Sequence, residues 1–152
     1  MRRHLAIAIC ALLAMQTVVA AEKAERLTPA EISALPFAGN GAGTSGVATI
    51  RTSVLSGDPS KSGLYTIQIV IPPHTTIGAH RHRDDRVATV VAGIWYIGYG
   101  AQRDAGALKE LSTGSFYTEP AGEPHFAGTG DQPATVQITG YGPTDTVYVD
   151  AG

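Results

Sequence analysis

Residues 77–93 read IGAHRHRDDRVATVVAG and place two histidines, His80 and His82, two positions apart and ahead of a β-branched run. Residues two apart in a strand point to the same face of the sheet, so the two imidazoles lie where one cation can meet both. The run that follows indicates a further strand and stops at Gly93. A His-x-His pair alone fits a solvated polar edge as well as it fits a metal site.

A third histidine, further along the chain, supplies the second half of the pattern. Residues 114–125 read GSFYTEPAGEPH, which is a glycine, a short strand, a type I turn predicted at 119–122, and then His125. Three imidazoles are a ligand set that suits iron, zinc, copper or nickel, and manganese becomes favoured if an aspartate joins them. The two stretches together therefore favour a metal site.

These two stretches resemble the two motifs of the cupin superfamily. The first motif is a His-x-His, a glutamate a few residues later and then a glycine, and the chain has His80, His82 and Gly93 at those places. The second motif is a glycine, five residues, Pro-x-Gly, two residues and a histidine, and it is matched in full by Gly114, Pro120, Gly122 and His125. The resemblance implies a small double-stranded β-helix, or jelly-roll barrel, whose metal-binding histidines point into its mouth.

The chain departs from the first motif at the glutamate. Seven residues before Gly93, where the family places this ligand, the chain has Arg86. Strict alternation puts Asp84 and Arg86 on the face of the histidines and turns Asp85 away. Three alternatives follow: a site of three histidines only, a site in which Asp84 or Asp85 replaces the glutamate, and a metal-free site in which Arg86 binds an anion or pairs with an aspartate.

The charge of Arg86 constrains any metal site. A guanidinium about 6 Å from a divalent ion costs on the order of 5 kcal/mol at an effective dielectric constant of ~20. If a metal ion binds, we therefore expect Arg86 to be neutralised by Asp84 or Asp85, or turned away. Three neutral imidazoles leave the cation its full charge, which favours an anionic ligand such as a carboxylate, enolate or phenolate.

The rest of the chain predicts an all-β fold with a short N-terminal helix. Short β-branched and aromatic runs alternate with turn residues at 47–55, 64–71, 86–92, 94–99, 108–111, 115–118, 135–139 and 146–149. Ala92-Gly93 is interpreted as a tight hairpin between the runs on either side of it. Strands at this spacing close into a sandwich or a barrel, and the cupin resemblance selects the jelly-roll barrel.

Three segments are expected along the chain. Residues 1–21 combine a basic start, an apolar core too short to span a bilayer and small residues at 18–21, which predicts a secretory signal peptide. Residues 22–46 predict a leader, a short helix capped by Thr28 and Glu31, and a Gly-rich connection. Residues 47–152 form the barrel domain. We therefore expect an exported protein, periplasmic or secreted, without a membrane anchor after cleavage.

Composition narrows the partners and the possible metal ligands. A formal net charge of −2 offers no basic stripe for phosphates, which argues against a nucleic-acid binder. The single cysteine, Cys10, lies in the predicted signal, so any metal ion is held by His, Asp or Glu. A small molecule is the expected partner, and a homodimer is implied by the resemblance alone.

The expected function is that of a metal-dependent enzyme acting on a small anionic or phenolic molecule. Oxygenase chemistry ranks first because open positions on such a centre can bind oxygen and substrate together, and metal-polarised isomerase or lyase action follows. The alternative from another class is a non-catalytic ligand-binding or sensing cupin that holds an anion on Arg86.

The other polar and aromatic residues are predicted to lie at the surface or to pack in the core. His74 is expected in an exposed loop, and Glu119 and Glu123, which flank the predicted turn, are expected in solvent. Trp95, Tyr117 and the other strand aromatics are expected to pack in the core or at a subunit interface, with one or two of them lining the cavity.

Overall fold

Strand β4 (Arg86–Tyr99) joins the two halves of the structure. The computed structural model describes residues 24–38 and 41–149, so the predicted signal peptide lies outside the described residues. The first half of β4 pairs antiparallel with β8 (Ala134–Gly142) and β6 (Phe116–Glu119). Its second half pairs antiparallel with β7 (His125–Gly128) and β5 (Lys109–Ser112).

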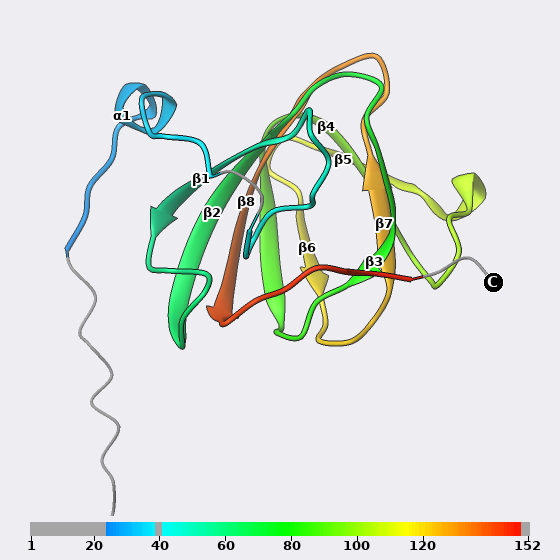
Figure 1. Cartoon of the computed structure of the whole chain (residues 1–152). Coiled ribbons are helices and arrows are strands. Elements are labelled where there is room, and N and C mark those ends of the chain that lie inside the picture. The colour runs from blue at the N-terminus through cyan, green and yellow to red at the C-terminus, as the bar shows by residue number, and fades with distance from the viewer. Residues whose placement is uncertain (1–23, 39–40, 150–152) are drawn as a thin grey trace, which may run out of the picture.

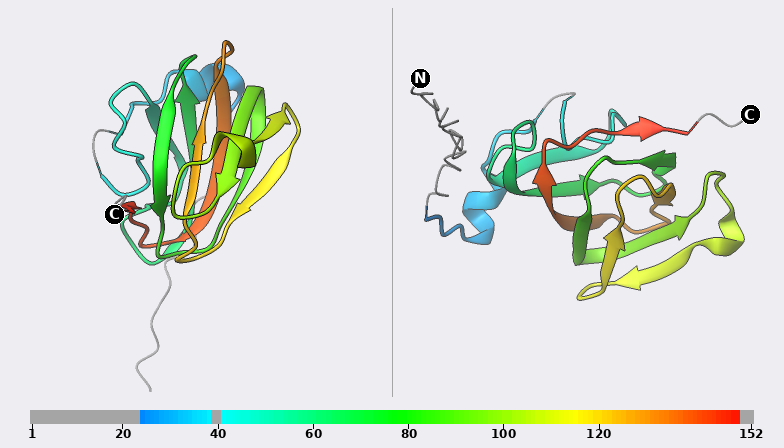
Figure 2. Two further views of the ribbon diagram at one scale, coloured as in Figure 1. Left: turned by 90° about the vertical axis from the view of Figure 1, so that its right-hand side faces the viewer. Right: turned by 90° about the horizontal axis from the view of Figure 1, so that it is seen from below.

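The remaining strands extend these two sheets. The first sheet continues beyond β8 with β2 (Gly63–Ile71) and β1 (Arg51–Ser56), and the second continues beyond β7 with β3 (Thr76–Arg81) and β9 (Val147–Tyr148). The order is β1-β2-β8-β4-β7-β3-β9, and the sheet curls around a common interior (Figures 1 and 2). This arrangement confirms the predicted all-β jelly-roll barrel.

The predicted helix is present as α1 (Pro29–Ser33), outside the sheet (Figure 1). The Glu31 backbone NH donates to the Thr28 hydroxyl, and the Glu31 carboxylate accepts from the Thr28 backbone NH at 2.7 Å. The only other helical turn in the described ranges is η1 (Ala105–Ala107). Among these residues, no helix is long and apolar enough to cross a membrane.

Gly93 lies within a continuous strand, so the predicted hairpin at Ala92-Gly93 is wrong. The register between β4 and β8 shifts between Val90 and Ala92, and this bulge lets β4 bend from one sheet into the other. Gly93 has a φ of +76°, and a Cβ at this position would lie 1.9 Å from the carbonyl oxygen of Pro133. A close approach of two backbones therefore requires glycine here.

The two strands that carry the histidines are absent from the runs predicted by hydrophobicity. β3 has the sequence TIGAHR and β7 the sequence HFAG, which offer too few apolar residues for a strand pattern. Both strands are nevertheless paired in the second sheet, where β3 lies between β7 and β9.

The core lies between the two sheets and becomes polar at one end. Its apolar part consists of inward-facing side chains of both sheets, including Tyr65, Ile67, Val90, Trp95 and Val136. At the polar end, the buried side chains are His80, His82, Asp84, Arg86, Glu119 and His125. Alternation along the chain explains this set, because the even-numbered residues from 80 to 90 are all buried.

Candidate metal centre

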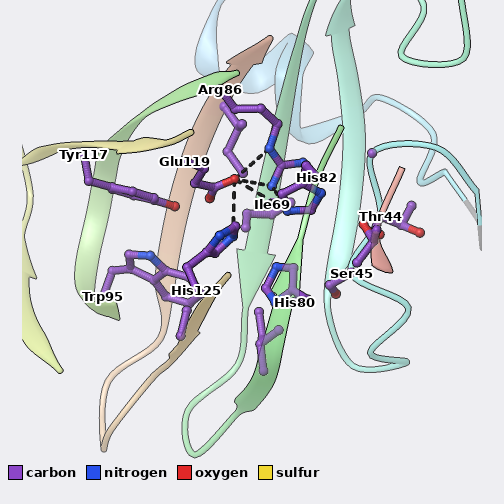
Figure 3. A pocket seen from close by; sticks show the side chains of 15 residues that line it. Thr44, Ser45, Ile69, His80, His82, Arg86, Trp95, Tyr117, Glu119 and His125 are labelled. Carbon is purple, nitrogen blue, oxygen red and sulfur yellow. Dashed lines mark hydrogen bonds and ion pairs between the residues drawn. The ribbon is translucent and has the colours of Figure 1, made fainter. Parts of the chain in front are cut away.

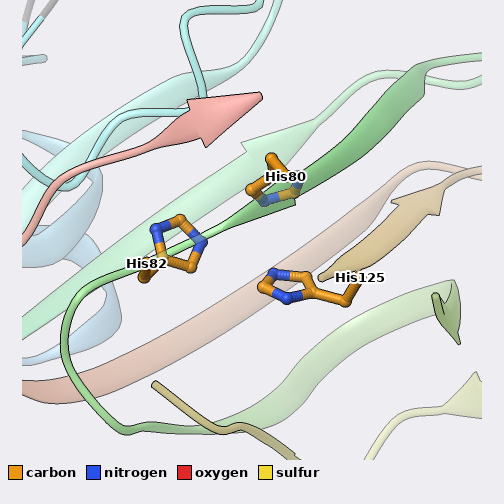
Figure 4. Close-up of side chains that lie close together, drawn as sticks. All are labelled: His80, His82 and His125. Carbon is orange, nitrogen blue, oxygen red and sulfur yellow. The ribbon is translucent and has the colours of Figure 1, made fainter. Parts of the chain in front are cut away.

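The three predicted histidines converge at the polar end of the barrel (Figure 4). His80 lies on β3, His82 follows the last residue of that strand, and His125 opens β7 opposite His80. One ring nitrogen of each histidine lies within 4.8 Å of those of the other two. The exposed fractions are 5%, 3% and 1%, so the rings face an interior site.

Backbone carbonyl groups orient all three rings. The Nδ1 atoms of His80, His82 and His125 lie 2.8, 2.5 and 3.2 Å from the carbonyl oxygens of Gly78, Asp145 and Glu123 respectively. Because a carbonyl oxygen only accepts, each Nδ1 carries the proton and each Nε2 keeps its lone pair. This is the tautomer that a histidine needs to bind a metal ion through Nε2.

Burial keeps the three rings neutral. Burial, followed by the neighbouring His125, lowers the pKa of His80 to about 4. Burial, followed by the charge of Arg86, lowers the pKa of His82 to about 3. Burial also lowers the pKa of His125. All three imidazoles are therefore in the ligating form at neutral pH.

Glu119 faces the histidines, and the prediction that it lies in solvent is wrong. Its carboxylate oxygen Oε2 lies 3.7 Å from Nε2 of His82 and 3.6 Å from Nε2 of His125, and the residue is 4% exposed. The predicted turn starts one residue later, because the NH of Glu123 donates to the carbonyl of Pro120 and Gly122 has a φ of +75°, as in a type II turn. Glu119 therefore ends strand β6, where alternation directs it inward beside Tyr117.

Arg86 is buried against Glu119 (Figure 3). Its Nε donates to Oε2 of Glu119 at 2.6 Å, its Nη2 also donates to that oxygen, and the same Nη2 lies 2.6 Å from Nε2 of His82. Burial is the largest single influence and raises the pKa of Glu119, but the charge of Arg86, the neighbouring His125 and His82 and the hydrogen bond from Arg86 together lower that pKa to about 2. Arg86 is therefore neutralised by Glu119, and not by Asp84 or Asp85 as expected.

Asp84 and Asp85 accept hydrogen bonds from groups outside the histidine cluster. Oδ2 of Asp84 accepts from the Tyr65 hydroxyl at 2.7 Å, and Oδ1 accepts from the Thr144 hydroxyl at 2.5 Å. Asp85 is exposed and accepts from the backbone NH of Ala121 at 2.8 Å. Neither belongs to the group of residues that could hold a metal ion, so the alternative in which Asp84 or Asp85 replaces the missing glutamate is not supported.

The carboxylate of Glu119 lies at a distance from His82 and His125 that allows one divalent ion to be shared. With metal–ligand bonds of about 2.1 Å, two ligand atoms of one ion lie at most ~4.2 Å apart. Oε2 of Glu119 meets this limit toward both His82 and His125. Nε2 of His125 is buried and has no hydrogen-bond partner among the described residues, which is the state expected of an atom that coordinates a metal ion.

A cavity of about 30 Å³ lies beside the three rings, and Trp95 and Tyr117 form part of its wall (Figure 3). Nε1 of Trp95 and the hydroxyl of Tyr117 are buried and have no hydrogen-bond partner among the described residues. One water molecule occupies roughly 10–15 Å³ of such a volume, so the cavity has room for a small ligand group. The expectation that one or two strand aromatics line the cavity agrees with this arrangement.

Residues of the predicted Gly-rich connection close this end of the barrel. Thr44 and Ser45 line the cavity together with Thr146. The Thr146 hydroxyl donates to the carbonyl of Thr44 at 2.9 Å, and the Tyr148 hydroxyl donates to the carbonyl of Ser45 at 2.6 Å. His74, in contrast, is exposed as predicted and is not among the cavity-lining residues.

Comparison with known proteins places the fold. No family model matches the chain, and no curated protein sequence matches it. Among solved structures, the chain is similar to the polyketide cyclase RemF from Streptomyces resistomycificus, with 19% identity over 68% of this chain and 73% of that one and a TM-score of 0.58.

Two further structures cover more of the chain. An RmlC-like cupin from Shewanella frigidimarina NCIMB 400 has 16% identity over 79% of this chain and 92% of its own, with a TM-score of 0.57. The DMSP lyase DddQ from Ruegeria pomeroyi DSS-3 has 15% identity over 87% of this chain and 85% of its own, with a TM-score of 0.59. The protein therefore has the cupin fold that its two histidine motifs predicted.

Proposed function

We propose that the protein binds one divalent metal ion through His80, His82 and His125 and uses it as an enzyme on a small molecule. The observation that carries this proposal is the convergence of three buried, neutral imidazoles whose Nδ1 protons are all committed to backbone carbonyls. A bound ion would supply Lewis-acid or redox chemistry at this point. The protein's own groups would hold and orient the substrate.

The proposed substrate class is a small carboxylate, enolate or phenolate. In the metal-free protein the guanidinium of Arg86 is engaged by Glu119 and His82, so in that state it is not free to bind the substrate. The NH of Trp95 and the hydroxyl of Tyr117 are buried donors that lack a partner among the described residues. A ligand oxygen can accept from both, whereas an apolar ligand that displaces water leaves each donor unpaired at a cost of about 1–3 kcal/mol.

Oxygenase chemistry is the first reaction class that we propose. Three ring ligands leave room around an ion for more than one further ligand, and the rest of the wall contains apolar side chains that exclude water, among them Ile69, Ile77 and Ile138. The metal is iron, manganese, zinc, nickel or copper, of which iron, manganese and copper suit this reaction class.

Isomerase or lyase action is the second candidate, and the hydroxyl of Tyr117 favours it. Burial, together with the negative charge of Glu119, raises the pKa of this hydroxyl well above its usual range. Tyr117 therefore keeps its proton at neutral pH and can donate a hydrogen bond to an oxygen that gains negative charge during enolisation.

The first experiment measures metal content. The purified protein is loaded anaerobically with Fe(II), Mn(II) or Zn(II), and metal per chain is determined by mass spectrometry for wild type, His80→Ala and His125→Ala. His74→Ala is the matched control, because His74 is exposed and is not among the cavity-lining residues. We expect about one ion per chain in wild type and control and a loss of most of the bound metal in the other two variants. Equal binding by all four proteins rejects the proposal.

The second experiment separates the two reaction classes. The metal-loaded protein is mixed with a panel of small carboxylates and phenols, and oxygen uptake and products are followed together. Oxygen uptake that depends on His125 supports the oxygenase. Isomerised or eliminated products without oxygen uptake support the second candidate, and ligand binding without any product supports a non-catalytic binding cupin.

We also infer that the protein is exported, on the basis of the signal pattern in residues 1–21. N-terminal sequencing of the protein recovered from its native cells tests this inference. We expect the mature chain to begin after Ala20 or Ala21 and to be found outside the cytoplasm. A cytoplasmic protein that keeps residues 1–21 contradicts it.

A further inference from the structure

The guanidinium of Arg86 lies where a metal ion would have to bind. Its Nη2 is 2.6 Å from Nε2 of His82 and donates to Oε2 of Glu119. Oε2 in turn lies within 3.7 Å of Nε2 of both His82 and His125 (Figure 3). One positively charged group of the chain is therefore already bound to two atoms that face the histidine cluster.

The Nε2 atom of His82 cannot bind the guanidinium of Arg86 and a metal ion at the same time. Its Nδ1 proton is committed to the carbonyl of Asp145, so Nε2 is the one nitrogen of this ring that can bind a metal ion. A neutral imidazole nitrogen has a single lone pair in the plane of the ring. A hydrogen bond from Arg86 and a bond to a metal ion both use that lone pair, so they exclude each other.

The carboxylate of Glu119 has the same two possible partners. Arg86 and Glu119 are Cα partners in the ladder between β4 and β6, so Glu119 stands directly across from the place where the family motif has its glutamate. Its Oε2 is close enough to the ring nitrogens of His82 and His125 to share one ion with them. Glu119 on β6 thus places a carboxylate beside the histidines, where β4 has an arginine.

We propose that Arg86 competes with the metal ion for Nε2 of His82 and Oε2 of Glu119, and that Glu119 becomes the fourth ligand when the ion displaces the guanidinium. This inference rests on the metal site proposed above. The guanidinium of Arg86 then competes with the metal ion and thereby lowers the metal affinity of the site. The ion enters only if the guanidinium leaves His82, because two cations at this distance repel each other.

The test measures Co(II) affinity by visible absorption in competition with a chelator, which needs no knowledge of the substrate. Arg86→Met removes the guanidinium charge, and Arg86→Gln removes the charge but keeps a hydrogen-bond donor. Arg103→Met is the matched control, because Arg103 is exposed and is not among the cavity-lining residues. We expect Co(II) to bind at least tenfold tighter to both Arg86 variants and within twofold of wild type to the control.

The role of Glu119 is tested in the absence of the arginine. Glu119→Gln is made in the Arg86→Met background, so that a loss of affinity reports coordination and not an unpaired arginine. We expect a loss of at least tenfold relative to Arg86→Met alone, while Glu110→Gln, at an exposed residue that bonds to Tyr96 far from the histidines in the sequence, leaves the affinity unchanged. Near-ultraviolet circular dichroism verifies the fold of each variant.

The outcomes separate this inference from the proposed function. Tighter binding by the Arg86 variants, or binding by these variants alone, supports the competition. Unchanged or weaker binding by both Arg86 variants overturns it while the metal site itself stands. If neither wild type nor any variant binds Co(II), Fe(II), Mn(II) or Zn(II), the proposed metal function fails and the competition falls with it.

Discussion

Arg86 and Glu119 are direct partners across the β4–β6 ladder, and their buried side chains form an ion pair next to His82. An arginine thus occupies the place of the family's glutamate, and a glutamate stands opposite. Each charge is removed from water, so each depends on the other for its solvation. The pair links the stability of the barrel to the chemistry of the histidine cluster.

Breaking this ion pair is expected to destabilise the metal-free protein strongly. Glu119→Gln leaves a buried guanidinium without its counter-charge and lowers the free energy of unfolding by about 3–5 kcal/mol. Denaturant titration measures this loss.

The control for this prediction is Arg83→Met, which removes a surface ion pair and costs less than about 1 kcal/mol. The double variant Arg86→Met/Glu119→Leu, which has no unpaired charge, is expected to regain most of the loss. An equal loss in the single and the double variant would contradict the explanation by an unpaired charge.

Binding of a small carboxylate is expected to change the fluorescence of Trp95, the single tryptophan of the chain. Trp95 lines the cavity beside Tyr117, and a ligand oxygen that accepts from both alters the surroundings of the indole. In metal-loaded protein, Tyr117→Phe is expected to weaken carboxylate binding by roughly tenfold, because it removes one buried hydrogen bond.

The matched control is Tyr96→Phe, which removes a hydroxyl that bonds to Glu110 at the surface. It is expected to leave both affinity and fluorescence change as they are in wild type. If Tyr117→Phe binds as tightly as this control, the hydroxyl of Tyr117 has no role in holding the ligand.

Gly93→Ala is expected to destabilise the protein by more than the strain of a positive φ alone. The added Cβ would lie 1.9 Å from the carbonyl oxygen of Pro133, so β4 and the segment before β8 would have to separate. Gly46→Ala is the comparison, because Gly46 has a similar φ of +72° and open space around it.

The comparison variant is expected to cost about 1–2 kcal/mol, and Gly93→Ala at least ~2 kcal/mol more. Thermal unfolding of both variants measures the difference. Equal costs would show that the strand relaxes around the new methyl group.

The free energy of unfolding is expected to fall at alkaline pH because the hydroxyl of Tyr65 is buried. Burial raises the pKa of Tyr65 to about 12, whereas a tyrosine of the unfolded chain titrates near 10. The unfolded state therefore loses its proton first, so this contribution to stability is complete below pH ~10 and is lost as the pH rises toward 12.

The measurement is the free energy of unfolding as a function of pH between about 9 and 12. Tyr65→Phe is expected to be less stable at neutral pH, because Asp84 loses a buried hydrogen bond, but to fall less steeply in alkali. Equal slopes for wild type and variant would show that the hydroxyl does not titrate in this range.

Features that depend on neighbours along the chain were predictable. Thr28 and Glu31 form their capping box within a single turn, so the four residues of that turn suffice to predict it. The inward direction of His80 and His82 follows from the two-residue period of an extended chain. The spacing of the second motif was sufficient to select His125 as the third member of the cluster.

Features that depend on a partner strand were missed. The sequence predicts a turn at Gly93, but glycine is required there because of Pro133. That residue lies on a segment that comes close to β4 only in the folded protein. The motif predicts the turn one residue too early, at 119–122, and therefore predicts Glu119 in solvent. The alternation of buried and exposed residues in β6 was the available signal, since it puts Tyr117 and Glu119 on one face.

The amino-acid order alone determined an all-β chain, because strand periodicity is a local property, and the resemblance of its two motifs to those of cupins implied a jelly-roll barrel with three histidines at one point. Only the tertiary structure decided which carboxylate completes the cluster. Arg86 and Glu119 are separated by 33 positions, and no local pattern relates them. The pairing of β4 with β6 brings them face to face, and burial then makes the two charges depend on each other.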